Sequence, residues 1–136
     1  FLNGESKGID DIMAGLKEKG LIRAHGVSCH NLEALKRCID EPWVDSVHAR
    51  INPYGEKMDG PVEDVVPVLQ AIHAAGKGVV GMKIIGEGAF RDSDEMRDRS
   101  VSFALNLGCV DVLNVGCENL DEVDDLAARV QRARLE

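Results

Sequence analysis

The fold is indicated most directly by one stretch, residues 76–86, which reads GKGVVGMKIIG. Its apolar part, Val79–Ile85, is short and is bounded by glycines that mark turns. An apolar run of this length between turn residues is typical of a strand buried in a parallel sheet. The stretch therefore predicts one strand of an α/β protein.

Three further apolar runs repeat this pattern along the chain: Ile22–Ser28, Val44–Ile51 and Val110–Val115. Each run leads into a segment with helical spacing, and another helical segment precedes the first run. We expect the order α–β–α–β–α–β–α–β–α without a linker, in one domain that spans residues 1–136. The sequence thus predicts successive parallel βα units.

Several residues signal where the helices begin. Ser6 and Asn31 can cap the first two helices, because their side-chain oxygens can accept from free backbone N–H groups. Pro67 is tolerated in a first turn, so we expect the third helix to begin near Asp64. These signals set the boundaries of the predicted units.

The acidic composition argues against several classes of function. The chain has 136 residues, a formal net charge of −8 and few aromatic residues. It therefore lacks the basic surface with which proteins bind nucleic acid or anionic membranes. No apolar stretch reaches the length of a membrane span. We expect neither a nucleic-acid partner nor a membrane partner.

The four cysteines show no CxxC spacing and are spread over a helix, a strand entry and two strand ends: Cys29, Cys38, Cys109 and Cys117. This distribution favours reduced thiols in a cytoplasmic protein over a disulfide framework. Cys29 and His30 are adjacent, and adjacent side chains on a strand point to opposite faces. Because such a pair chelates poorly, we expect no metal site.

Parallel strands place the ligand site beyond their carboxyl ends. The residues that follow each apolar run are therefore the candidates for binding. Four βα units can form a small doubly wound sheet, or they can be half of an eight-stranded barrel. A half-barrel leaves two sheet edges and one inner face uncovered.

At the strand ends the amino-acid sequence is similar to that of the aldo/keto reductases. Residues 20–28, GLIRAHGVS, resemble the family's GKIRAIGVSN, and residues 44–52, VDSVHARIN, resemble VDVVQVxYN. Residues 76–86 resemble GIxVLAxxPLGGG. Residues 110–116 and the helix from Leu120 resemble the closing VSSVIVGxSSPEQLDEN. The four motifs occur in the same order and at the same spacing as in the family, from about residue 10 to residue 130.

The resemblance implies an α/β fold that is half of a TIM (β/α)8 barrel, namely units five to eight. Family enzymes transfer hydride between a nicotinamide cofactor, NAD or NADP, and a small carbonyl or alcohol substrate. Their acid/base set of Asp, Tyr, Lys and His lies on the first four strands. This chain is therefore expected to hold no catalytic residue and to be inactive alone, since carbonyl reduction needs a proton donor.

The resemblance also implies a cofactor-binding set on this chain: Ser28, His48, Lys83, Gly86, Gly88, Gly116 and Asn119. Ser28 matches the serine that holds the nicotinamide carboxamide, and the usual next residue, Asn, is Cys29 here. His48 stands at the family's Gln position. Lys83 lies where an aromatic ring commonly stacks on the nicotinamide.

The glycine loop and the last loop match the phosphate side of the family's site. Free backbone N–H groups at Gly86 and Gly88 can meet a pyrophosphate. Gly116 and Asn119 match the last phosphate loop, and Asn119 also forms a capping box with Glu122. Acidic residues stand where the family commonly carries basic ones near a 2′-phosphate. NAD is therefore favoured over NADP.

Two functions and two assemblies stay open at this point. The chain is half of an NAD(P)-linked oxidoreductase, or a non-catalytic module that binds a phosphorylated metabolite or a partner chain. The missing N-terminal half belongs to the intact gene product or another chain, or two copies of this chain pair. The sequence begins at Phe1, and we treat it as a fragment.

Overall fold

The computed structural model describes residues 7–133, in which helices and strands alternate in the predicted order. The elements are α1 (Lys7–Glu18), β1 (Gly26–Ser28), α2 (Leu32–Arg37), β2 (Ser46–Arg50), α3 (Val62–Ala74), β3 (Gly78–Met82), the 3-10 turn η1 (Gly86–Gly88), α4 (Asp94–Asn106), β4 (Val112–Leu113) and α5 (Leu120–Ala133). Within this range no helix has the length and apolar character to cross a membrane.

The four strands form one parallel sheet in the order β1-β2-β3-β4. The register aligns Ser28 with His48, His48 with Val80, and Val80 with Val112. The predicted parallel βα units are therefore confirmed. The strands β1 and β4 are shorter than their apolar runs, because each lies at an edge and pairs with only one neighbour.

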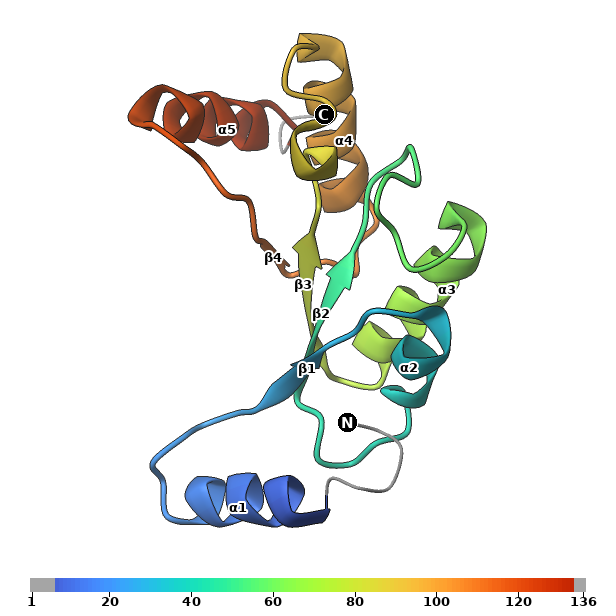
Figure 1. Cartoon of the computed structure of the whole chain (residues 1–136), viewed down its shortest axis with the longest axis vertical. Coiled ribbons are helices and arrows are strands. Elements are labelled where there is room, and N and C mark those ends of the chain that lie inside the picture. The colour runs from blue at the N-terminus through green and yellow to red at the C-terminus, as the bar shows by residue number, and fades with distance from the viewer. Residues whose placement is uncertain (1–6, 134–136) are drawn as a thin grey trace.

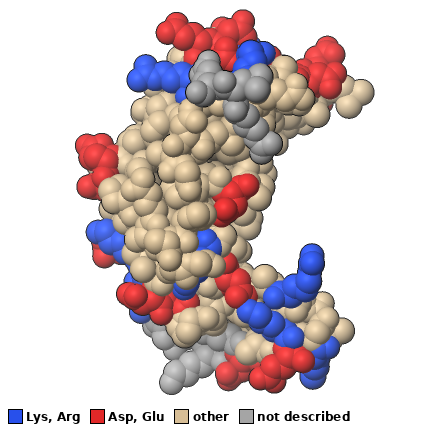
Figure 2. Space-filling model, turned by 180° about the vertical axis from the view of Figure 1, so that it is seen from behind, with Lys and Arg blue, Asp and Glu red and all other residues tan. Residues whose placement is uncertain are grey.

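The sheet has one covered and one open face. Helices α2 and α3 lie against one face, while α1 and the α4–α5 pair lie at opposite ends of a crescent (Figure 1). Seen from behind, the surface is hollowed on the side away from α2 and α3 (Figure 2). Side chains alternate accordingly: Val47, Ala49 and Val79 are buried, whereas His48 and Arg50, one residue along, are half-buried.

Two aspartates join neighbouring strands at the amino ends of the sheet. Asp45 precedes β2, and its carboxylate accepts from the backbone N–H of His25 at 2.9 Å and from Nζ of Lys17 at 2.7 Å. Asp111 precedes β4 and accepts from the backbone N–H of Val79 at 2.7 Å. The hydrogen bond from Lys17 is the largest cause that holds the pKa of Asp45 below its usual range, and the hydrogen bond from the N–H of His25 is the next. These contacts help to fix the strand register.

Asn52, which follows β2, is the polar side chain that joins neighbouring strands at the carboxyl ends of the sheet. Its side chain is fully buried, and all of its hydrogen-bonding capacity toward the backbone is used. Nδ2 donates to the carbonyl oxygens of Glu56 at 2.8 Å and Lys83 at 3.1 Å. Oδ1 accepts from the backbone N–H groups of Tyr54 and Glu56, both at 3.1 Å. One amide thereby folds the loop after β2 and ties it to the end of β3.

The helix starts agree with the sequence in one case and differ in another. Asn31 caps α2 through a 2.8 Å bond from the N–H of Ala34, as predicted. Helix α3 begins at Val62 instead of near Asp64, because Pro61 supplies the restricted φ of a helix start. Pro67 consequently lies inside the helix, on its exposed side, where water can reach the carbonyl that loses its partner. Ser6 lies outside the described residues.

Helix α5 buries a charged side chain. The apolar spacing suggests Val123, Leu126, Ala127 and Val130 as the inward face, but Val123 and Ala127 are exposed, whereas Arg129 and Ala133 are buried. The prediction is wrong for Val123 and Ala127 because α5 meets α4 through an ion-pair cluster.

That cluster has Arg129 at its centre. Its guanidinium donates to Asp94 at 2.6 Å, to Asp98 at 2.7 Å and to Asp125 at 2.8 Å, so α4 and α5 are joined by charge. The guanidinium holds the pKa values of Asp94 and Asp125 below their usual range. The acidic run at residues 121–125 suggests a solvated helix face, and this interpretation is wrong for Asp125, which pairs with Arg129.

Replacing Asn52 tests the tie between β2 and β3. In N52A the N–H groups of Tyr54 and Glu56 and the carbonyl oxygens of Glu56 and Lys83 lose a partner that is itself fully buried. We expect a loss of about 3 kcal/mol in the free energy of unfolding, measured by urea denaturation. The exposed Asn106 at the end of α4 is the matched control, and N106A should change stability little. Equal effects of the two substitutions would contradict the assigned role.

Candidate functional site

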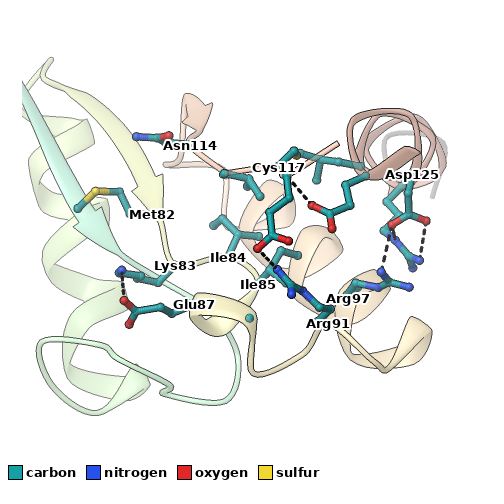
Figure 3. A pocket seen from close by; sticks show the side chains of 17 residues that line it. Met82, Lys83, Ile84, Ile85, Glu87, Arg91, Arg97, Asn114, Cys117 and Asp125 are labelled. Carbon is teal, nitrogen blue, oxygen red and sulfur yellow. Dashed lines mark hydrogen bonds and ion pairs between the residues drawn. The ribbon is translucent and has the colours of Figure 1, made fainter. Parts of the chain in front are cut away.

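A pocket of about 530 Å³ lies at the carboxyl ends of β3 and β4. Its walls come from the end of β3, the η1 turn, the segment after β4, and the facing sides of α4 and α5 (Figure 3). The volume is within the range of small-molecule sites. The pocket therefore occurs where the parallel topology places ligands.

Lys83 stands at the mouth of this pocket with an uncommon backbone. The sequence suggests a lysine inside a strand, but β3 ends at Met82 and Lys83 adopts φ of 58°. Its Nζ lies 3.1 Å from Oε1 of Glu87, and the hydrogen bond from Lys83 is the main cause that lowers the pKa of Glu87. The left-handed region is unfavourable for a residue with a Cβ, and such strain clusters at functional sites.

The glycine loop differs from the expectation of free N–H groups. The N–H of Gly86 donates to the carbonyl of Lys83 at 2.9 Å, and that of Gly88 donates to Ile85 at 3.0 Å. Gly86 is buried, and a Cβ there would lie 2.7 Å from the ring of Phe90. Gly88 lines the pocket with φ of 93°. The loop thus shapes the pocket, while both glycine amides are engaged within the turn.

Acidic and basic side chains around the pocket are paired. Arg91 donates to Glu118 at 2.6 Å, and this contact raises the pKa of Arg91. Glu122 accepts from the N–H of Glu118 at 2.8 Å, and its own N–H donates to Oδ1 of Asn119 at 3.0 Å. The capping interaction at Asn119 is confirmed, although the Glu122 carboxylate reaches the N–H of Glu118 instead of that of Asn119. Each of the four lysines and arginines that line the pocket has a carboxylate partner.

The expected cofactor set divides into two groups along the same end of the sheet. Lys83, Gly88 and Gly116 line the pocket, and Gly86 lies beneath it. Asn119 caps α5 beside Glu118. Ser28 and His48 are register partners on β1 and β2 and lie outside the pocket wall. The structure therefore places Lys83, Gly88 and Gly116 together and leaves Ser28 and His48 on the neighbouring part of the rim.

Solved structures share this architecture, whereas neither a protein-family profile nor a curated protein matches the sequence. A putative aldo-keto reductase from Pseudomonas aeruginosa is similar with a TM-score of 0.74 and 22% identity over 96% of this chain. The holo form of an aldo-keto reductase from Bacillus halodurans gives a TM-score of 0.70 and 17% identity over 91% of this chain. This chain has the fold of half an aldo/keto reductase barrel.

The match covers 45% of the Pseudomonas aeruginosa chain and 51% of the Bacillus halodurans chain. The chain thus spans about half the length of these structures. At such low identity, the likeness concerns the fold. The expected half of a TIM barrel and the expected resemblance to aldo/keto reductases are confirmed.

Sequence reasoning missed a polar group at the end of β2 in this half-barrel. Arg50 donates to Nδ1 of His30 at 2.6 Å and lies 3.3 Å from the carboxylate of Asp59. The Asp59 side chain is 2% exposed, and burial raises its pKa. The signal was available, since Arg50 places a cation at the last position of β2, at the end of the strand where ligands are expected. Within residues 7–133, no three His, Cys, Asp or Glu residues gather in a way that suits a metal ion.

Substitutions of Lys83 test whether its backbone is strained. K83G relieves the left-handed conformation, and we expect a gain of about 1 kcal/mol in the free energy of unfolding. K83A removes the same charge but keeps the Cβ, so it should give no gain. Both are measured by urea denaturation. A K83G variant no more stable than K83A would contradict the assignment of strain.

Proposed function

We propose that this chain is the C-terminal half of an NAD(P)-linked oxidoreductase of aldo/keto reductase type. The observation that carries the proposal is the pocket at the carboxyl ends of β3 and β4, in a half-barrel whose fold matches those reductases. When bound, the nicotinamide supplies hydride transfer to or from a carbonyl or alcohol carbon. The proton donor lies on the other half, so this chain binds and orients the cofactor and is inactive alone.

The glycines of the pocket support a dinucleotide of this kind. A Cβ at Gly116 would meet no atom within 4 Å, so packing does not require glycine there, whereas the φ of 93° at Gly88 is itself a reason for glycine. Glycine also allows a ligand to approach the backbone closely. We assign Gly88, Gly116 and Asn119 to the phosphate side, with Gly86 shaping the turn. Ser28 and His48, with Lys83 between the two groups, then face the nicotinamide side.

The charges of the pocket favour NAD over NADP. A 2′-phosphate needs an available cation, but Arg91 is already paired with Glu118. Glu122 adds a second carboxylate beside it. Anionic groups this close repel a phosphate. The lack of an available cation therefore disfavours the phosphorylated dinucleotide.

The uncovered surfaces support a partner that completes the barrel. Strands β1 and β4 each have one unpaired edge within the described sheet. Apolar side chains on α1 and β4 are solvent-exposed, with Ile12 63% and Val112 53% accessible. Exposed edges and apolar surface of this kind mark interaction sites. We propose that the missing N-terminal half, or a second copy of this chain, covers them.

Titration with NADH tests the proposal. Trp43 is the only tryptophan and precedes β2, at the end of the sheet opposite to the pocket, so energy transfer to bound NADH is the appropriate signal. If the dissociation constant is near 100 μM, NADH at ten times that concentration would raise the free energy of unfolding by about 1.4 kcal/mol. A thermal shift provides the second readout. We expect binding that is weaker in G116V, which fills the pocket, than in G15A on α1.

A different outcome favours the second function. If neither energy transfer nor a thermal shift occurs at millimolar NADH or NADPH, the oxidoreductase proposal is wrong for this chain. The exposed sheet edges then favour the non-catalytic module, whose ligand is a phosphorylated metabolite or a partner chain.

Cofactor preference tests the role of Glu118. E118Q removes the charge that neutralises Arg91, and we expect affinity for NADPH to rise about fivefold relative to NADH. E63Q on α3 changes the net charge equally but lies away from the pocket, so it should leave the ratio unchanged. An unchanged ratio in E118Q would contradict the charge argument while leaving dinucleotide binding intact.

A further inference from the structure

Cys29 and Cys38 form a buried pair of thiols behind the rim of the sheet. Cys29 follows β1 directly, and Cys38 is the C-terminal cap of α2. Their sulfur atoms lie 3.6 Å apart, and the residues are 3% and 0% exposed. Both residues are free thiols. No other pair of sulfur atoms in residues 7–133 makes such a contact.

The two thiols are chemically unequal. The two sulfurs share one hydrogen bond, which is the main cause that lowers the pKa of Cys38 and raises that of Cys29. Burial raises the pKa of Cys29 further. Nζ of Lys77 donates to the carbonyl of Cys38 at 2.7 Å, and its charge also favours a thiolate at Cys38. We assign Cys38 as the nucleophile of the pair because Lys77 lies beside it, whereas the nearby charge on Cys29 is the carboxylate of Asp59.

The geometry permits a bond between these sulfurs with a small movement. A disulfide bond is about 2.05 Å long, so the sulfurs must approach by about 1.5 Å. The Cys38 thiol donates to the carbonyl oxygen of Ala34 at 3.2 Å, and this bond must open, whereas the cap of α2 at Asn31 involves neither sulfur and can persist. Strand β1 is a three-residue edge strand, and elements of this kind open locally at low cost, which admits a small oxidant.

We propose that Cys29 and Cys38 are a redox site at which a hydroperoxide converts the two thiols to a reversible disulfide. The Cys38 thiolate attacks one peroxide oxygen, the O–O bond breaks, and the leaving oxygen takes a proton as water or an alcohol. The product is a sulfenic acid on Cys38. The Cys29 sulfur then attacks the Cys38 sulfur, and the Cys29 proton leaves with the sulfenic oxygen as water.

This reaction balances without any further reagent. The two thiols together lose two electrons, and the peroxide bond gains them. A dithiol such as dithiothreitol reverses the change by thiol–disulfide exchange. The reaction uses no dinucleotide and is independent of the proposed cofactor site, while access through β1 requires the free edge that this chain has on its own.

Peptide mapping tests the pair directly in the full chain. Trypsin cuts after Lys36 and Arg37, between the two cysteines, so the disulfide joins peptides 24–36 and 38–50. After hydrogen peroxide treatment, blocking of free thiols and digestion, we expect the joined pair with a mass lower by two hydrogen atoms. Dithiothreitol should release the two peptides. Cys109 is equally buried and should remain a free thiol.

Two variants test the order of events. C29S removes the resolving thiol, so we expect a sulfenic acid that a dimedone probe traps on Cys38. C38S removes the nucleophile, so Cys29 should stay unmodified under the same peroxide dose. Labelling of Cys29 in C38S that equals labelling of Cys38 in C29S would overturn the assigned roles. In the unaltered chain, absence of the joined peptides at a dose that oxidises half-exposed Cys117 would overturn the proposal itself.

Discussion

The buried side-chain amide of Asn52 is the interaction on which the carboxyl end of the sheet depends. It hydrogen-bonds to backbone groups in two segments, namely the loop after β2 and Lys83 after β3. No apolar residue of similar size can replace these bonds, because it would leave two N–H groups and two carbonyl oxygens in a partly buried place without their partner. The position of Lys83 at the pocket mouth follows from this tie.

The two ends of the sheet use polar groups differently. At the amino ends, Asp45 and Asp111 accept backbone N–H groups of neighbouring strands and fix the register. At the carboxyl ends, acids and bases pair around a pocket, and Lys83 adopts an unfavourable backbone beside it. Strain and open space are therefore concentrated at the carboxyl ends, beside the Asn52 tie that holds them. This division is expected of a barrel whose ligand binds at the carboxyl ends.

Much of the fold could be predicted from the sequence, because glycines and apolar runs report local structure. The four parallel βα units and the cap at Asn31 follow from such signals. The inward face of α5 could not be predicted, since Arg129 is buried only because α4 brings Asp94 and Asp98 to it. That contact joins segments far apart in the chain, and helical spacing carries no information about it.

The site was predictable in position but not in detail. Strand-end glycines located Gly88 and Gly116 at the pocket, whereas the engaged amides of the glycine turn depend on the conformation after β3. The pairing of Arg91 with Glu118 likewise joins two loops and has no local signal. The pocket's charge balance therefore became visible only in three dimensions.

Amide hydrogen exchange of the loop after β2 tests the central tie most directly. The N–H groups of Tyr54 and Glu56 donate to Asn52, so we predict exchange about as slow as that of Ile51, which donates to Met82 in the sheet. The N–H of Met58, with a long 3.4 Å bond to Gly55 within the loop, should exchange faster. Exchange of Tyr54 and Glu56 as fast as Met58, with Ile51 still protected, would contradict the account.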